Sequence, residues 1–186
     1  QPSGTDLRYR MASAKFGPLT SDSVDVHFTL RNEGVGSTIL SEGVRTRLDS
    51  DYVVIMTKFR TGTAIGMSLA APNTVPSILD DSLYIRVAQA TDYYGSVTVE
   101  ISSYVTNDTL RVTLPFLAAS PFYRLAKGPY RVRAFRDGDP LPIATVNDVG
   151  SSANLYFTVI VAGDDSSVTL DVLDEFNAAR QGFDPT

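Results

Sequence analysis

The sequence contains few residues of the types that catalysis usually requires. It has one histidine, His27, and no cysteine. His27 lies on the polar side of the alternating segment 24–30, "VDVHFTL", where it could in principle join a Ser-His-Asp triad or bind zinc. No G-x-S-x-G motif and no second histidine accompany it, so a surface or interface histidine is the better interpretation. We therefore predict that the chain is not an enzyme.

Three pairs of aspartates are candidates for metal binding. Asp164 and Asp165 follow Gly163 in a pattern that superficially resembles the acidic turn of viral polymerases, where paired aspartates hold two divalent ions. A polymerase needs a far larger domain, so we interpret this pattern as a turn between strands. Calcium at a subunit boundary stays an open alternative, because hard cations bind clustered carboxylates. We otherwise expect no metal and no cofactor. The other two pairs are Asp49 with Asp51 and Asp80 with Asp81.

Two further motifs concern binding. Tyr93 and Tyr94 are adjacent and could form a platform on which a sugar stacks, although such residues in a β-sandwich more often belong to the core or its rim. Asn107-Asp108-Thr109 fits the glycosylation sequon but is more simply a turn. No glycine-rich loop follows a strand and opens a helix, so nucleotide binding has no support.

Composition limits the classes of protein to consider. The chain of 186 residues is 43% hydrophobic and 20% charged, which is typical of one globular domain. No apolar run approaches the ~20 residues of a membrane-spanning helix. The net charge of -5 argues against a surface that mainly binds phosphates. Because the chain begins with Gln1 and has no signal pattern, we expect it to be processed or excised from something longer.

Alternating hydrophobicity at period two is the main structural signal, and it predicts about nine strands. Helical periodicity is confined to 171–181, which predicts a short terminal helix, and 34–41 and 136–142 are expected to be loops. Short strands separated by Gly and Pro turns indicate an all-β sandwich or barrel. The predicted strands are 24–30, 51–59, 64–72, 82–90, 96–102, 110–114, 130–135, 155–163 and 167–173.

The order of segments in the second half resembles picornavirus-like capsid proteins. "TNDTLRVTLPFLAASPFYRL" (106–125) is similar to a strand that ends in a Pro-aromatic pair and continues through a Ser-Pro corner. "GPYRVRAFRDGDPLP" (128–142) and "NLYFTVIVAGDDSSV" (154–168) resemble the next strand and the last one, and "GTAIGMSLAAP" (62–72) fits more faintly. The resemblance covers roughly residues 95–170, and it lies in the succession of segments rather than in one motif.

This resemblance implies an antiparallel eight-stranded jelly-roll β-sandwich with at most a short C-terminal helix. The expected divisions are an N-terminal extension over 1–20, a jelly-roll capsid domain over 21–172 and a C-terminal tail over 173–186. The chain is short for a major capsid protein and lacks a basic N-terminal arm, so contact with the genome is expected to be indirect. A protruding domain of a larger coat protein is an alternative.

The resemblance also suggests a use for the corner after residue 114. A strand that stops at Pro115 cannot continue its hydrogen-bond ladder, so the chain must leave the sheet there. Burial of the following aromatics against another subunit would help to hold a shell together. The alternative is a loop folded back on its own core. The predicted interface residues are Pro115, Phe116, Leu117, Pro121, Phe122 and Tyr123.

The function implied by the resemblance is a structural capsid protein of a non-enveloped icosahedral RNA virus. Its expected partners are copies of itself, sibling capsid proteins, genomic RNA indirectly and a host receptor, with no membrane span. Its expected location is the virion, assembled in the host cytoplasm. The alternative is a secreted or phage β-sandwich module that recognises carbohydrate or protein.

Overall fold

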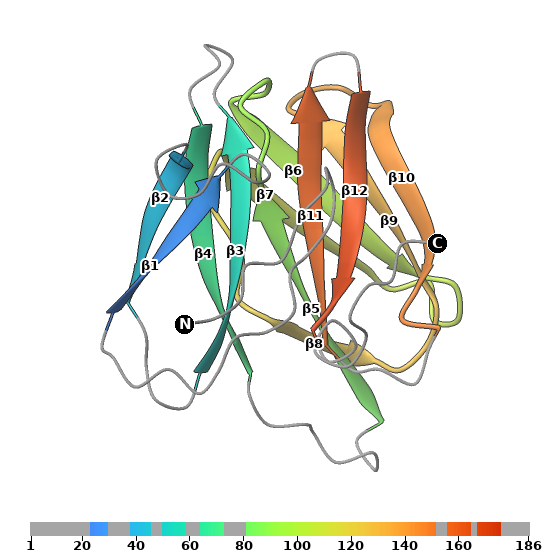
Figure 1. Ribbon diagram of the computed structural model, residues 1–186. Helices are drawn as coiled ribbons and strands as arrows, with labels where there is room; N and C mark the ends of the chain where they lie inside the picture. The colour runs from blue at the N-terminus through green and yellow to red at the C-terminus, as the bar shows by residue number, and fades with distance from the viewer. Residues whose placement is uncertain are drawn as a thin grey trace, which may run out of the picture. The chain divides into compact units, whose positions relative to one another are not determined.

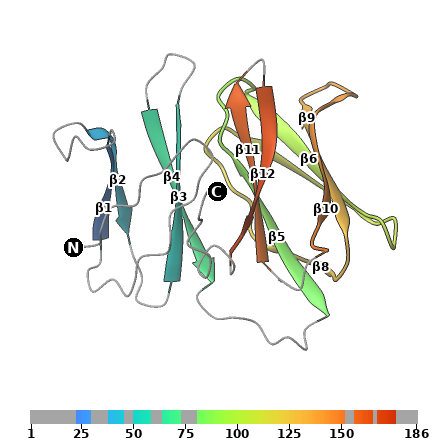
Figure 2. The same ribbon diagram turned by 45° about the vertical axis from the view of Figure 1, so that its right-hand side comes forward.

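The computed structural model describes residues 23–29, 38–45, 50–58, 64–72, 81–151, 156–164 and 167–175. The chain divides into two compact units. We call residues 1–75 with 177–186 the hairpin unit, and residues 76–176 the sandwich unit (Figures 1 and 2). The domain boundaries expected from the sequence, at 20/21 and 172/173, stay predictions.

In its described part, the hairpin unit consists of two antiparallel hairpins. β1 (Ser23–Thr29) pairs with β2 (Thr38–Arg45), and β3 (Ser50–Lys58) pairs with β4 (Ala64–Pro72). The strands predicted at β1, β3 and β4 are confirmed. The loop predicted over 34–41 is wrong for residues 38–41, which belong to β2, because cross-strand pairing with β1 outweighs the local abundance of small residues.

The sandwich unit is built from two four-stranded sheets, which lie face to face in Figure 1. The first sheet has the order β10-β9-β6-β7 and the second has the order β12-β11-β5-β8. The chain passes between the sheets four times, after β5, β7, β8 and β10. The strands are β5 (Ser82–Gln89), β6 (Ser96–Ser103), β7 (Thr109–Pro115), β8 (Tyr123–Ala126), β9 (Tyr130–Arg136), β10 (Pro142–Val149), β11 (Tyr156–Asp164) and β12 (Ser167–Asp174).

The core lies between the two sheets and uses the alternating faces that the sequence predicts. β5 and β6 each contribute three alternating side chains to the core cluster, all at most 1% exposed, because successive residues of a strand point to opposite faces. Burial of apolar area, at about 25 cal/mol per Å², is the main stabilising term. These six residues are Leu83, Ile85, Val87, Val97, Val99 and Ile101.

The all-β, sandwich-like architecture is confirmed, with three differences from the expected pattern. β5 and β11 are parallel neighbours, so the expected wholly antiparallel arrangement is wrong at this pair. The terminal helix is wrong for residues 171–174, which pair with β11 as part of β12, while 176–186 lie outside the described residues. β8 and β10 add two strands that the sequence pattern missed.

Candidate functional site

The predicted corner runs along the edge of β5 in the sandwich unit. The Leu117 N–H donates to the Gln89 carbonyl at 2.9 Å, and the Gln89 N–H donates to the Ala118 carbonyl at 2.8 Å. Two residues further on, the Ser120 N–H donates to the Val87 carbonyl at 2.9 Å, and the Ser120 Oγ accepts from the Val87 N–H at 3.0 Å. The corner therefore extends the hydrogen bonding of this sheet beyond β8.

The corner's side chains divide into exposed prolines and half-buried apolar groups. Pro115 and Pro121 are exposed, whereas Phe116, Leu117, Phe122 and Tyr123 are half-buried. Phe122 meets the Tyr156 ring edge-on at 5.2 Å, and the Arg86 guanidinium lies 4.6 Å from its centroid. Phe122 thus has contacts within its own chain. The assignment of the six corner residues to a subunit interface stays a prediction.

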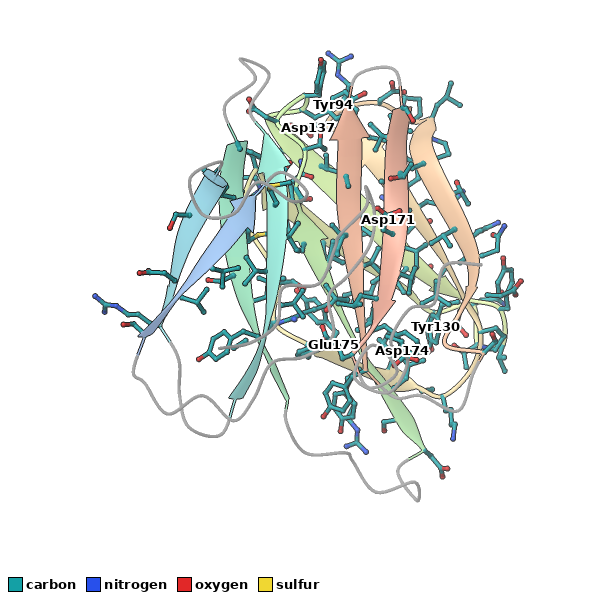
Figure 3. All side chains as sticks on the ribbon, viewed as in Figure 1. Tyr94, Tyr130, Asp137, Asp171, Asp174 and Glu175 are labelled. Carbon is teal, nitrogen blue, oxygen red and sulfur yellow. The ribbon has the colours of Figure 1, made fainter. Side chains whose placement is uncertain are left out.

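A buried polar cluster lies beside Phe122. Arg86 donates to the Thr158 hydroxyl at 2.7 Å and pairs with the Glu175 carboxylate at 2.8 Å. Thr158 also hydrogen-bonds Glu175, which follows the end of β12 (Figure 3). Burial lowers the pKa of Arg86, although the Glu175 carboxylate opposes the shift. All three side chains are almost fully buried, so this cluster holds strands together rather than meeting a ligand.

The outward face of the first sheet carries a row of charges. Glu100 on β6 pairs with Arg111 on β7 and with Arg133 on β9. Arg111 donates to Glu100 Oε2 from two nitrogens, at 2.7 and 3.0 Å, and Arg133 Nε donates to Oε1 at 3.1 Å. Burial alone would raise the pKa of Glu100, but hydrogen bonds from Arg133 and Arg111 outweigh it and hold this pKa below its usual value.

Two neighbouring depressions open at one end of this face. The Tyr94 depression, of about 300 Å³, is lined by Tyr93–Gly95 of the β5–β6 connection and Ser96 at the start of β6, and by Arg136 at the end of β9 and Asp137 after it. The Phe135 depression, of about 400 Å³, is lined by Thr98, Arg111, Phe135, Arg136, Gly138, Asp139 and Pro140. Arg136 lines both depressions, and we treat them together as one candidate site.

Within this site, the rings of Tyr94 and Phe135 each lie beside an arginine. The Arg136 guanidinium lies 5.7 Å from the Tyr94 ring centroid, and the Arg133 guanidinium lies 5.4 Å from that of Phe135. Both distances are within the range of cation–π attraction. Figure 3 shows Tyr94 and Asp137 close together at the end of the sandwich unit. The site thus presents aromatic surface, cations and carboxylates together.

The sequence located only part of this site. It singled out Tyr93 and Tyr94 as a possible sugar platform, or more often part of the core or its rim. Both line the Tyr94 depression, and Tyr94 also packs against the core, so the alternative is confirmed for this residue. It missed Arg136 and Asp137 because their segment was interpreted as a turn-rich loop. Charged residues in a predicted loop and an aromatic pair in another part of the sequence do not indicate a binding site until the fold shows that they lie together.

Neither depression is lined by any of the other candidate residues whose side chains the structure describes. Asn107 lies in the exposed β6–β7 connection with φ of 60°, as the expected turn requires. The side chains of His27 and of the Asp49, Asp51, Asp80, Asp164 and Asp165 candidates lie outside the described residues. Among the residues that are described, no group of three or more His, Cys, Asp or Glu is placed to hold a metal ion. Within the same residues, no helix has the length and apolar character that crossing a membrane requires.

Comparison of the chain with family models, with curated proteins and with solved structures found no match. Functional inference therefore depends on the geometry and chemistry of the chain itself.

Proposed function

We propose that the sandwich unit is a non-catalytic recognition module that binds carbohydrate at the Tyr94 and Phe135 depressions. The observation that carries this proposal is the Tyr94 ring beside the Arg136 guanidinium in an open depression. An aromatic face supplies apolar contact area. The polar groups around it, on Ser96, Arg136 and Asp137, can donate to and accept from the hydroxyls of a sugar.

The shape of the site favours one unit of a longer chain as the ligand. Binding sites for small molecules are usually enclosed and bury most of the ligand. The two depressions here are open to solvent and share Arg136 in their linings. A polymer can place one unit at Tyr94 and the next near Phe135, whereas a free small molecule would stay mostly in water.

The test is binding of the full chain to a panel of immobilised polysaccharides, compared with the Tyr94→Ala variant. Loss of the ring should weaken binding by at least about tenfold, because aromatic anchors dominate small contact sites. Tyr104→Ala is the matched control, since Tyr104 is an exposed tyrosine 49% accessible at the other end of β6. If no polysaccharide binds, or if both variants lose binding equally, the proposal is wrong.

The second proposal is the capsid subunit that the sequence resemblance implies. It is supported by the half-buried apolar residues of the corner and by two sheets of four strands, the number that an eight-stranded jelly roll requires. The parallel β5/β11 pair is a departure from that fold. Assembly would then bury Phe116 and Phe122 against neighbouring subunits and sibling capsid proteins.

Light scattering and negative-stain microscopy of the protein from its native source test this second proposal. Particles tens of nanometres across that contain RNA and sibling chains would support it. A monomer of 20.1 kDa would contradict it. The Phe116→Ala/Phe122→Ala variant separates the two roles of the corner: if it folds and assembles like the parent, the corner is not the interface.

A further inference from the structure

The first sheet has an unusual distribution of charge for an acidic protein. The chain carries a net charge of -5, yet β7 and β9 place arginines on or beside the outward face of this sheet, with Glu100 as the carboxylate between two of them. The acidic excess therefore lies elsewhere on the chain. These arginines are Arg111, Arg131, Arg133 and Arg136.

The arginines differ in whether they already pair with a carboxylate of the chain. Arg111 and Arg133 both bind Glu100, although the Arg111 side chain is still 71% exposed. Arg136 is exposed and contacts the Tyr94 ring, and no carboxylate among the described residues pairs with it. A guanidinium carries five donors, so a ring contact on its face leaves its edge able to bind an anion.

We propose that the polysaccharide bound at this site is acidic, with sugar rings that carry carboxylates, and that Arg136 and Arg111 bind those carboxylates. This inference rests on the proposed carbohydrate recognition and names the class of ligand. Each depression pairs aromatic surface with an arginine that lines it. A carboxylated sugar presents the same two features, a ring and an anion that matches the guanidinium fork.

The surroundings of the arginines distinguish this ligand from other polyanions. Asp137 and Asp139 line the same depressions. They can accept hydrogen bonds from the free hydroxyls of a sugar ring, which the sugar–phosphate backbone of DNA does not offer. Nucleic acids bind mainly by phosphate neutralisation over a basic surface, and Asp137 and Asp139 interrupt such a surface here. A polymer of sugar rings that carry both hydroxyls and carboxylates can bind the aspartates through its hydroxyls and the arginines through its carboxylates.

The test is calorimetry of the full chain with polygalacturonate, with the same polymer after its carboxyls are reduced to alcohols, and with single-stranded DNA. We expect binding of the carboxylated polymer only. Arg136→Gln should weaken it by about tenfold or more, since a charge-assisted hydrogen bond is lost. Lys127→Gln is the matched control, because Lys127 is an exposed cation in the β8–β9 connection, outside both depressions. Thermal melting must show that both variants fold.

The outcomes separate this inference from the function on which it rests. If reduced and carboxylated polymers bind equally, and Tyr94→Ala but not Arg136→Gln weakens binding, carbohydrate recognition stands and the acidic ligand is wrong. If DNA binds as tightly as polygalacturonate, the arginines form a general anion surface and the inference is also overturned. If no polymer in this set or in the neutral panel binds, both proposals fail.

Discussion

Glu100 and Glu175 are both nearly inaccessible carboxylates in the sandwich unit, but their surroundings differ. Glu100, 3% exposed, lies between two arginines that reach water, whereas Glu175, 0% exposed, pairs with an arginine that is itself 5% exposed. A buried charge is costly unless it is paired and hydrogen-bonded. Stability should therefore respond differently to changes at the two sites.

Substitution of Glu100 by Gln should destabilise the protein in a pH-dependent way. Because its folded-state pKa is lowered, ionised Glu100 adds stability that is present in full above its usual pKa of 4.5 and is lost as pH falls through the lower folded value. At neutral pH we expect Glu100→Gln to cost about 1–3 kcal/mol. Urea unfolding of parent and variant from pH 7 to pH 3 measures this. A difference that grows on acidification would contradict it.

The Arg86–Glu175 pair should behave as a coupled unit. Glu175→Ala leaves the Arg86 charge buried without its carboxylate, which typically costs about 3–5 kcal/mol. Arg86→Met/Glu175→Leu removes both charges and keeps much of the volume, so it should be markedly more stable than the single variant. A double-mutant cycle of the parent, Arg86→Met, Glu175→Leu and the double variant, measured by chemical denaturation, gives the coupling energy. Additive effects would show that the two residues do not depend on each other.

From the sequence alone, Glu100 and Arg86 are recognisable only as polar positions within predicted alternating strands. Both lie on the side away from the apolar core, which the pattern assigns to solvent. The partner of Arg86 is 89 positions away in the sequence, and one sequence alone carries no signal for such a pairing. The same limit applies to Arg136 and Tyr94, which the fold brings together from the end of β9 and the β5–β6 connection.

At the scale of strands, the clearest predictions came from long alternating segments, and the misses have local causes. β8 has only four residues and follows Pro121, so its pattern is too short to detect. β10 begins at Pro142, and its register against β9 shifts twice; Pro is tolerated at a strand's first residue. Asp171–Asp174 have a helical pattern locally, but eight register pairs with β11 hold β12 extended.

The end of β11 should be sensitive to its glycine, Gly163, which pairs with Val168 of β12. Gly163 has φ of 110°, and a Cβ there would lie 2.0 Å from the Ser167 carbonyl oxygen. Gly163→Ala must therefore move backbone, and we expect a loss of about 2 kcal/mol or more. Gly138→Ala is the matched control, because Gly138 has φ of 76° but nothing within 4 Å of its Cβ position. Thermal unfolding compares them, and an equal loss in both would refute the steric explanation.

At the scale of the whole molecule, pairing order is the feature that local patterns specify least. The sequence predicted strands and inward faces, and an all-β sandwich follows from these. The parallel β5/β11 contact joins strands that lie near opposite ends of the sandwich unit's sequence. Alternating residues look the same in parallel and antiparallel neighbours, so this contact, and with it the distinction between sandwich topologies, could not be predicted.

The overall charge should oppose the local attraction proposed for the Arg136 site, and salt can separate the two effects. The net charge of -5 repels an acidic polymer over the Debye length, which is about 30 Å at 0.01 M salt and about 10 Å at 0.1 M. The contact at Arg136 acts at close range and is screened much less. Raising salt over this range should therefore increase the association rate constant with polygalacturonate, and the dissociation rate constant should also increase as the bound pair weakens. Biolayer interferometry measures both. An association rate constant that falls steadily with salt would contradict this prediction. It would mean that the arginines of the first sheet, rather than the net charge, dominate the long-range field and steer the polymer to the site.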